Sequence, residues 1–139
     1  MKKRKSGFTL VELLVVIMII ALLASMVGPM LFGHLDDAER KTTKSQLANI
    51  SVALDSFRLD FRRYPTTEEG LKILSAKQSS LKQWNGPYLE KELKPDAWGN
   101  PYVYKSPGKD GNPYELLSYA ADGKEGGSDK KNRDISVWE

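Results

Sequence analysis

The chain has 139 residues, no cysteine and one histidine, His34, which excludes disulfide frameworks, thiolate-bound metals, sulfur nucleophiles and multi-histidine metal sites. Its 21 Lys and Arg against 18 Asp and Glu give a formal net charge of +3. The four cations of Lys2–Lys5 account for all of this excess, so the body of the protein is not basic. Nucleic acid is therefore not an expected partner, because a nucleic-acid-binding domain carries clustered positive charge on its folded surface.

A run of 20 residues without a charged side chain, Leu13–Phe32, dominates the N-terminal region. As a helix it would span ~30 Å, the hydrocarbon thickness of a bilayer. The run is longer than the apolar region of a secretory signal peptide, roughly 7 to 15 residues, and Ala21 and Ala24 are wrongly spaced for a small-x-small cleavage site. We therefore expect one membrane-spanning segment, with the basic N-terminus in the cytoplasm and the C-terminal domain outside.

Glu12 is the residue that breaks the pattern of a simple membrane anchor, because it lies four positions into the apolar segment that begins at Phe8. A carboxylate at the centre of a membrane helix costs ~2.5 to 3.5 kcal/mol, and less near an end. Glu12 either reaches the lipid headgroups or meets a positive charge inside the membrane. Carboxylates within membrane segments favour the second interpretation.

The segment Lys5-Ser6-Gly7-Phe8-Thr9-Leu10-Val11-Glu12-Leu13-Leu14 resembles the class III signal of type IV pilins and type II secretion pseudopilins. The resemblance implies that a prepilin peptidase cuts after Gly7 and methylates the new amino terminus at Phe8. Glu12 would then be the fifth residue of the mature chain and would pair with the Phe8 amine of a neighbouring subunit during assembly. Both charges would thereby be neutralised inside the membrane.

A single long helix is expected from Phe8 to Tyr64, where Tyr64-Pro65 is the first strong stop signal. Its second half carries apolar side chains at steps of three and four, which is typical of one buried helix face. These residues are Leu47, Ile50, Leu54, Phe57, Phe61 and Tyr64. The stripe is too short for a coiled coil, so we expect it to pack under the domain's own sheet. Pro29 predicts a kink, and the resemblance implies that it can become extended in a filament.

After the long helix, the sequence predicts a short second helix ending near Ser75 and three strands, at Tyr102–Ser106, Tyr114–Tyr119 and Asp134–Trp138. One long helix on a small antiparallel sheet of about three strands is an α+β fold, and the resemblance makes it type IV pilin-like. The Tyr64–Leu71 segment and the 84–102 segment resemble the major type II secretion pseudopilins, with Ala97 in place of the family's usual proline. The aromatic residues there are expected to anchor the core and loops: Trp84, Trp98, Tyr102 and Tyr104.

An acidic, glycine-rich loop, Ala121–Asp129, lies between the last two predicted strands. Taken alone, such a loop is more often a solvated hairpin connection than a calcium site, and the EF-hand pattern is missing. The resemblance implies a calcium site here, which would close the loop as a disulfide does in many pilins. Its carboxylates would be those of Asp122 and Asp129, with backbone oxygens from Tyr119, Lys124, Gly127 and Lys130.

These features predict three regions: a cleaved leader at 1–7, a hydrophobic polymerisation helix at 8–32 and a periplasmic domain at 33–139. The function implied is that of a structural subunit, not an enzyme, which polymerises into the periplasmic pseudopilus of a type II secretion system. Two alternatives remain open, a type IV pilus subunit and a monomeric membrane-anchored binding domain.

The resemblance also implies a set of partners and a location. We expect the inner membrane of a Gram-negative bacterium before assembly, with one membrane pass, and the periplasmic filament afterwards. The implied partners are further copies of this chain, minor pseudopilins, the prepilin peptidase, and the inner-membrane assembly platform with its ATPase. Calcium is the only cofactor expected.

Overall fold

The computed structural model describes residues 2–139. One helix, α1 (Leu10–Phe61, 52 residues), makes up much of the chain, and among the described residues it is the one helix long and apolar enough to cross a membrane. Contacts divide the chain into two compact units at Asp37/Ala38. This division lies a few residues after the predicted boundary at 33.

Helix α1 is shorter at both ends than the predicted Phe8–Tyr64. It begins only after Thr9, whose side chain caps it. It ends at Phe61 because Arg62 turns into the left-handed region (φ 56°) while its N–H still donates to the Arg58 carbonyl at 2.7 Å. The helix is continuous through Pro29, so the chain is helical at this proline.

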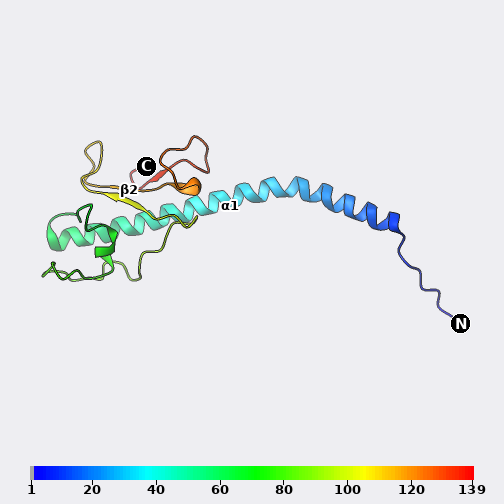
Figure 1. The fold of residues 1–139 in the computed structure, drawn as a ribbon, viewed down its shortest axis with the longest axis horizontal. Helices are drawn as coiled ribbons and strands as arrows, with labels where there is room; N and C mark the ends of the chain where they lie inside the picture. The colour runs from blue at the N-terminus through cyan, green and yellow to red at the C-terminus, as the bar shows by residue number, and fades with distance from the viewer. Residues whose placement is uncertain (1) are drawn as a thin grey trace. The chain divides into compact units, whose positions relative to one another are not determined.

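The sheet contains three short antiparallel strands in the order β1-β2-β3. They are β1 (Val103–Lys105), β2 (Glu115–Ser118) and β3 (Ile135–Ser136), so each predicted strand exists and is shorter than expected. Tyr104 pairs with Leu116 across β1 and β2, and Leu117 pairs with Ser136 across β2 and β3. Figure 1 shows β2 lying alongside the C-terminal part of α1.

The short second helix is a 3-10 helix, η1 (Leu71–Leu74), preceded by a turn. In that turn Thr66 and Glu69 bond reciprocally: the Thr66 N–H donates to the Glu69 carboxylate at 2.8 Å, and the Glu69 N–H donates to Thr66 Oγ1 at 3.2 Å. Arg63 adds a bidentate pair to the same carboxylate, at 2.7 and 2.8 Å. These bonds to Arg63 lower the pKa of Glu69.

The core forms where one face of α1 packs under β2, β3 and η1. The buried cluster contains Leu47, Ile50, Leu54, Phe57, Ile73, Leu74, Tyr114, Leu116 and Ile135. Four of the six predicted stripe residues belong to this cluster, and the other two, Phe61 and Tyr64, pack against it partly buried, which confirms that the stripe packs within the domain. The expected aromatic anchors surround this core: Trp84 Nε1 donates to the Ile73 carbonyl at 2.9 Å, and the Tyr104 hydroxyl donates to the Pro65 carbonyl at 2.8 Å.

The buried tyrosines predict that the domain loses stability in alkali. Burial raises the pKa of Tyr104 to about 12 and raises the pKa of Tyr102, Tyr114 and Tyr88 in the same direction. The unfolded chain ionises its tyrosines near pH ~10, so the folded state binds more protons above that pH and stability falls as pH rises towards the folded pKa.

Melting temperatures measured from pH 8 to pH 12 should therefore be flat at first and then decline above about pH 10. Tyr104→Phe removes one ionising group and should make that decline shallower, although it loses the bond to Pro65. An equally steep decline in Tyr104→Phe would contradict the assignment.

Candidate functional site

The predicted cleavage site lies outside regular secondary structure. Residues 2–9 precede α1, and the side chain of Phe8 is 84% exposed. A peptidase needs an extended, accessible backbone, and the residues around Gly7 have no helical hydrogen bonds to break before cleavage. The predicted cleavage site therefore lies in a stretch without helix or strand.

Glu12 lies in the first turn of α1 and bonds reciprocally with Thr9. The Thr9 N–H donates to Glu12 Oε2 at 3.1 Å, and the Glu12 N–H donates to Thr9 Oγ1 at 3.2 Å. This is a capping box, which satisfies two backbone donors that the helix start leaves without partners. Sequence reasoning had treated Glu12 only as a charge in the membrane, although the Thr-x-x-Glu spacing of residues 9–12 carried the signal for the cap.

The apolar surface of α1 after Glu12 has no protein cover. Large apolar side chains from Leu13 to Leu35 are roughly half to three-quarters exposed. A helix that is apolar on all sides requires lipid or other apolar helices around it. Glu12 is the only charged side chain from Phe8 to Leu35 apart from His34, which is counted as neutral at pH 7.

The C-terminal loop begins with a short 3-10 helix, η2 (Ala120–Asp122), which ends at Gly123 in the left-handed region. Gly126 and Gly127 also have positive φ, at 98° and 95°. At Gly127 a Cβ atom would collide with the Asn132 carbonyl. The loop thus folds back on itself in a way that requires glycine at position 127.

The two aspartates predicted as calcium ligands cap turns of their own loop in this structure. Asp122 Oδ1 accepts from the Lys124 N–H at 3.1 Å. Asp129 accepts from the Asn132 N–H at 2.8 Å and from Asn132 Nδ2 at 3.1 Å. Each carboxylate oxygen has about two lone-pair sites, so these bonds leave both side chains able to accept a cation as well.

Asp134, the first residue of the last predicted strand, contacts the loop in the structure. Its Oδ2 accepts from the Gly126 N–H at 2.9 Å, and the Asp134 N–H donates back to the Gly126 carbonyl at 3.1 Å. Its Oδ1 is buried and has no hydrogen-bond partner. A buried carboxylate oxygen without a donor is costly, and a bound cation would relieve that cost.

The loop is also attached to α1 by Arg40. This residue is only 8% exposed, and its Nη1 donates to the Arg133 carbonyl at 2.8 Å. The bond joins helix and loop across 93 residues of sequence. The sequence does not predict this contact, because a lone arginine on a polar helix face carries no signal of its distant acceptor.

The oxygen atoms of this loop are of the kinds that bind calcium. Calcium takes six to eight hard oxygen ligands, and this loop offers carboxylates, carbonyl groups and glycine turns. Within residues 2–139 no three acidic or imidazole side chains gather closely enough to hold a metal by themselves. A calcium ion here would therefore depend on backbone oxygens, for which Tyr119, Lys124, Gly127 and Lys130 remain the predicted donors. Tyr119 caps η2, and Lys124 and Gly127 lie in the glycine-rich turn.

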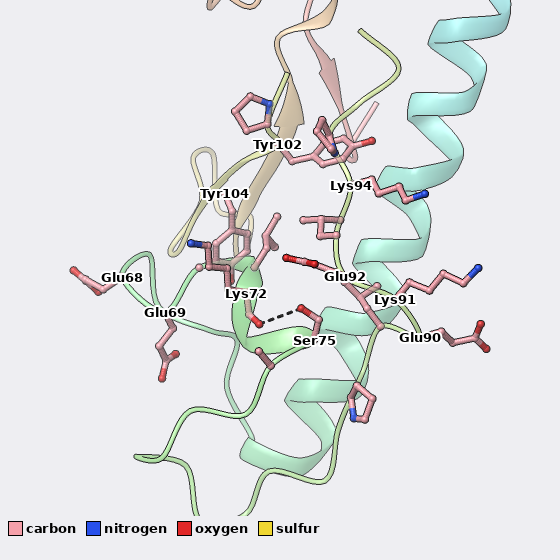
Figure 2. Close-up of a pocket in the computed structure, with 18 residues that line it drawn as sticks. Glu68, Glu69, Lys72, Ser75, Glu90, Lys91, Glu92, Lys94, Tyr102 and Tyr104 are labelled. Carbon is pink, nitrogen blue, oxygen red and sulfur yellow. Dashed lines mark hydrogen bonds between the residues drawn. The ribbon is translucent and has the colours of Figure 1, made fainter. Parts of the chain in front are cut away.

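A separate hollow of 910 Å³ lies between η1, the 87–95 segment and β1. Figure 2 shows that Tyr102 and Tyr104 line one side while Glu92 and Lys94 come from the facing segment. Ser75 is the one serine among the residues that line the hollow, and its Oγ donates to the Lys72 carbonyl at 3.4 Å. Its other polar side chains are carboxylates, lysines and tyrosines.

Comparison with known proteins identifies the family. Residues 30–138 match the model of type II secretion system protein G, and residues 2–28 match the prokaryotic N-terminal methylation motif. The chain belongs to the type II secretion protein G family. It is therefore a pseudopilus subunit of a type II secretion system, and this family is one of structural subunits.

Relatives support the match along nearly the whole chain. The type II secretion system core protein G of Pseudomonas aeruginosa is 42% identical, over 99% of this chain and 98% of its own. That of Vibrio cholerae is 39% identical, over 98% and 93%. The crystal structure of the major pseudopilin from the type 2 secretion system of enterohaemorrhagic Escherichia coli superposes with a TM-score of 0.61 at 33% identity, covering 78% of this chain and 93% of that one.

The comparisons also bear on the sequence predictions. They confirm the pilin-like fold and the pseudopilin assignment, and the methylation motif together with the apolar helix fits anchoring in the inner membrane. The predicted roles of Gly7, Phe8 and Glu12, and the calcium ligands, stay predictions.

The glycine turn of this pseudopilin loop offers a direct test of its geometry. Gly127→Ala places a Cβ against the Asn132 carbonyl and also forces a positive φ on a residue with a side chain, whereas Gly126→Ala meets only the second penalty because nothing lies within 4 Å. A left-handed residue other than glycine costs roughly 1 to 2 kcal/mol. Thermal unfolding should show both variants destabilised, and Gly127→Ala more than Gly126→Ala; equal effects would contradict the described close approach.

Proposed function

We propose that the mature subunit is Phe8–Glu139 and that it polymerises through α1 into the periplasmic filament that moves folded proteins across the outer membrane. The single observation that carries this proposal is Glu12, a carboxylate in the first turn of a helix whose following surface is wholly apolar and uncovered. Removal of the leader creates one amine, at Phe8, beside this carboxylate. The amine of a neighbouring subunit would neutralise Glu12 at the depth where both charges are costly.

The capping box supports a specific geometry for this pairing. Glu12 Oε2 is engaged by the Thr9 N–H of its own chain. Its second oxygen, Oε1, would accept the amine of the neighbouring subunit, because the Thr9 N–H bonds only Oε2. The capping bond would hold the carboxylate in one orientation before assembly, which lowers the entropy lost when the partner amine binds.

Two variants distinguish the capping bond of Glu12 from its negative charge. Glu12→Gln retains an acceptor for the Thr9 N–H, because glutamine also completes a capping box, but removes the charge. Glu12→Ala removes both. We expect processing after Gly7, measured by intact mass, to persist in both variants, and filament assembly to fail in both.

Normal filaments with Glu12→Gln but not Glu12→Ala would show that the cap alone matters and would overturn the charge pairing. An unprocessed chain in cells that contain the matching peptidase would instead favour the monomeric anchored-domain alternative. The type IV pilus alternative has less support, since the family match covers the C-terminal domain as well as the N-terminal motif.

We further propose that the domain faces the periplasm, that the subunit has no catalytic activity, and that calcium closes the C-terminal loop. The orientation is supported by Lys2–Lys5, which favour the cytoplasmic side. The calcium site is supported by Asp122 and Asp129 on either side of the glycine turn and by the buried, unpartnered Oδ1 of Asp134. The expected partners are minor pseudopilins, the prepilin peptidase, and the assembly platform with its ATPase.

Calcium that binds only the folded chain should raise its free energy of unfolding by RT ln(1 + [L]/Kd), about 2.7 kcal/mol at a calcium concentration a hundred times Kd. The melting temperature should rise accordingly. Asp122→Asn should weaken or abolish that shift, because it removes a charged ligand. Asp110→Asn is a matched control, since Asp110 lies in the β1–β2 turn at a positive φ of 54° that asparagine tolerates. No shift at millimolar calcium in the parent chain would overturn the site.

A further inference from the structure

Asp96 is the most deeply buried carboxylate of the described chain, with 5% of its surface exposed, and no cation is bonded to it. Its Oδ1 accepts from the N–H groups of Trp98 and Asn100, at 3.1 and 2.8 Å. Its Oδ2 accepts from the Ser118 hydroxyl at 2.5 Å. Its three hydrogen-bond donors come from two separate segments, the 96–100 turn and the end of β2, so this side chain joins them.

The group that Asp96 holds is the start of the calcium loop. Ser118 is fully buried, and its Oγ accepts from the Ala120 N–H at 3.0 Å while its own hydroxyl proton goes to Asp96. Ala120 has φ 53°, a left-handed conformation that costs a residue with a side chain roughly 1 to 2 kcal/mol. The carboxylate therefore orients the hydroxyl that stabilises a strained turn.

Asn100, from the same turn as Asp96, holds the other side of that strained residue. Its Nδ2 donates to the Ala120 carbonyl at 2.8 Å, and its amide packs against Gly123, where a Cβ would lie 3.0 Å from Asn100 Oδ1. The turn itself is tied to α1, since the Ala97 N–H donates to Thr43 Oγ1 at 3.3 Å. The segment from Ser118 to Gly123 is thus fixed by bonds from Asp96 and Asn100.

Two of the proposed calcium donors lie in this fixed segment: the Tyr119 carbonyl and the Asp122 carboxylate. We infer that Asp96 is a positioning residue for calcium, which acts through Ser118 and the left-handed Ala120 to aim these two donors into the loop. The inference rests on the proposed calcium site and adds to it a residue that touches no ion. Partners beyond the first ligand shell commonly change metal affinity by about 10- to 100-fold.

The variant Asp96→Asn tests this link with little change to the turn. Its amide oxygen can still accept from Trp98 and Asn100, but its NH₂ group would face Ser118 and leave the buried serine proton without an acceptor. Ser118→Ala breaks the same link from the other end. Ser51→Ala is a matched control, because it removes a part-buried hydroxyl bond to Tyr114 at 2.8 Å, away from the loop.

The experiment is calcium titration of the full chain in detergent micelles by calorimetry, together with melting temperatures without calcium. We expect Asp96→Asn and Ser118→Ala to raise the calcium Kd about tenfold or more. Ser51→Ala should lower the calcium-free melting temperature and leave the Kd unchanged. A purely structural role for Asp96 would lower only the melting temperature.

The outcomes separate the inference from the proposal beneath it. A parent chain that binds calcium, with both variants within about twofold of its Kd, would overturn the role of Asp96 and leave the calcium site standing. A parent chain that binds no calcium would overturn both. Should Asp96→Asn fail to fold, the Kd of Ser118→Ala decides the question by itself.

Discussion

The contact between one face of α1 and the sheet is the interaction on which the domain depends. The three strands contain three, four and two residues, and so small a sheet is not stable in water without a hydrophobic layer against it. Leu47, Ile50, Leu54 and Phe57 supply that layer, each almost fully buried. Apart from Glu12 and His34, the same helix has no charged or titratable side chain before residue 36, and it is apolar on one face after that, so one continuous helix contains both the candidate membrane span and part of the core.

The periodicity of apolar residues and the positions of turn residues predict the main elements of the fold. Steps of three and four from Leu47 to Tyr64 locate the buried face, and the glycine and proline density before Tyr102 separates helix from strands. The exact limits were not predictable, because they depend on single local bonds. Thr9 delays the start of α1 by capping it, and the left-handed Arg62 ends it before Tyr64.

The candidate sites show a similar division. The roles predicted for Gly7, Phe8 and Glu12 come from a linear motif, since the predicted chemistry involves adjacent residues. The contacts of Arg40, Asp96 and Ser118 could not, because each joins segments that are distant in sequence and meet only after folding. The orphaned oxygen of Asp134 likewise appears only when the surrounding donors are placed. Sequence reasoning therefore identified the acidic loop and missed the groups that hold it.

Both ends of the loop are attached, directly or through one turn, to neighbouring positions on α1. Arg40 bonds the Arg133 carbonyl at the C-terminal end, and Thr43 bonds Ala97 of the turn that fixes the N-terminal end. Residues three apart lie on the same side of a helix, so a single turn of α1 holds both ends of the loop. A force that twists or stretches α1 at this turn would therefore act on both ends of the loop at the same time.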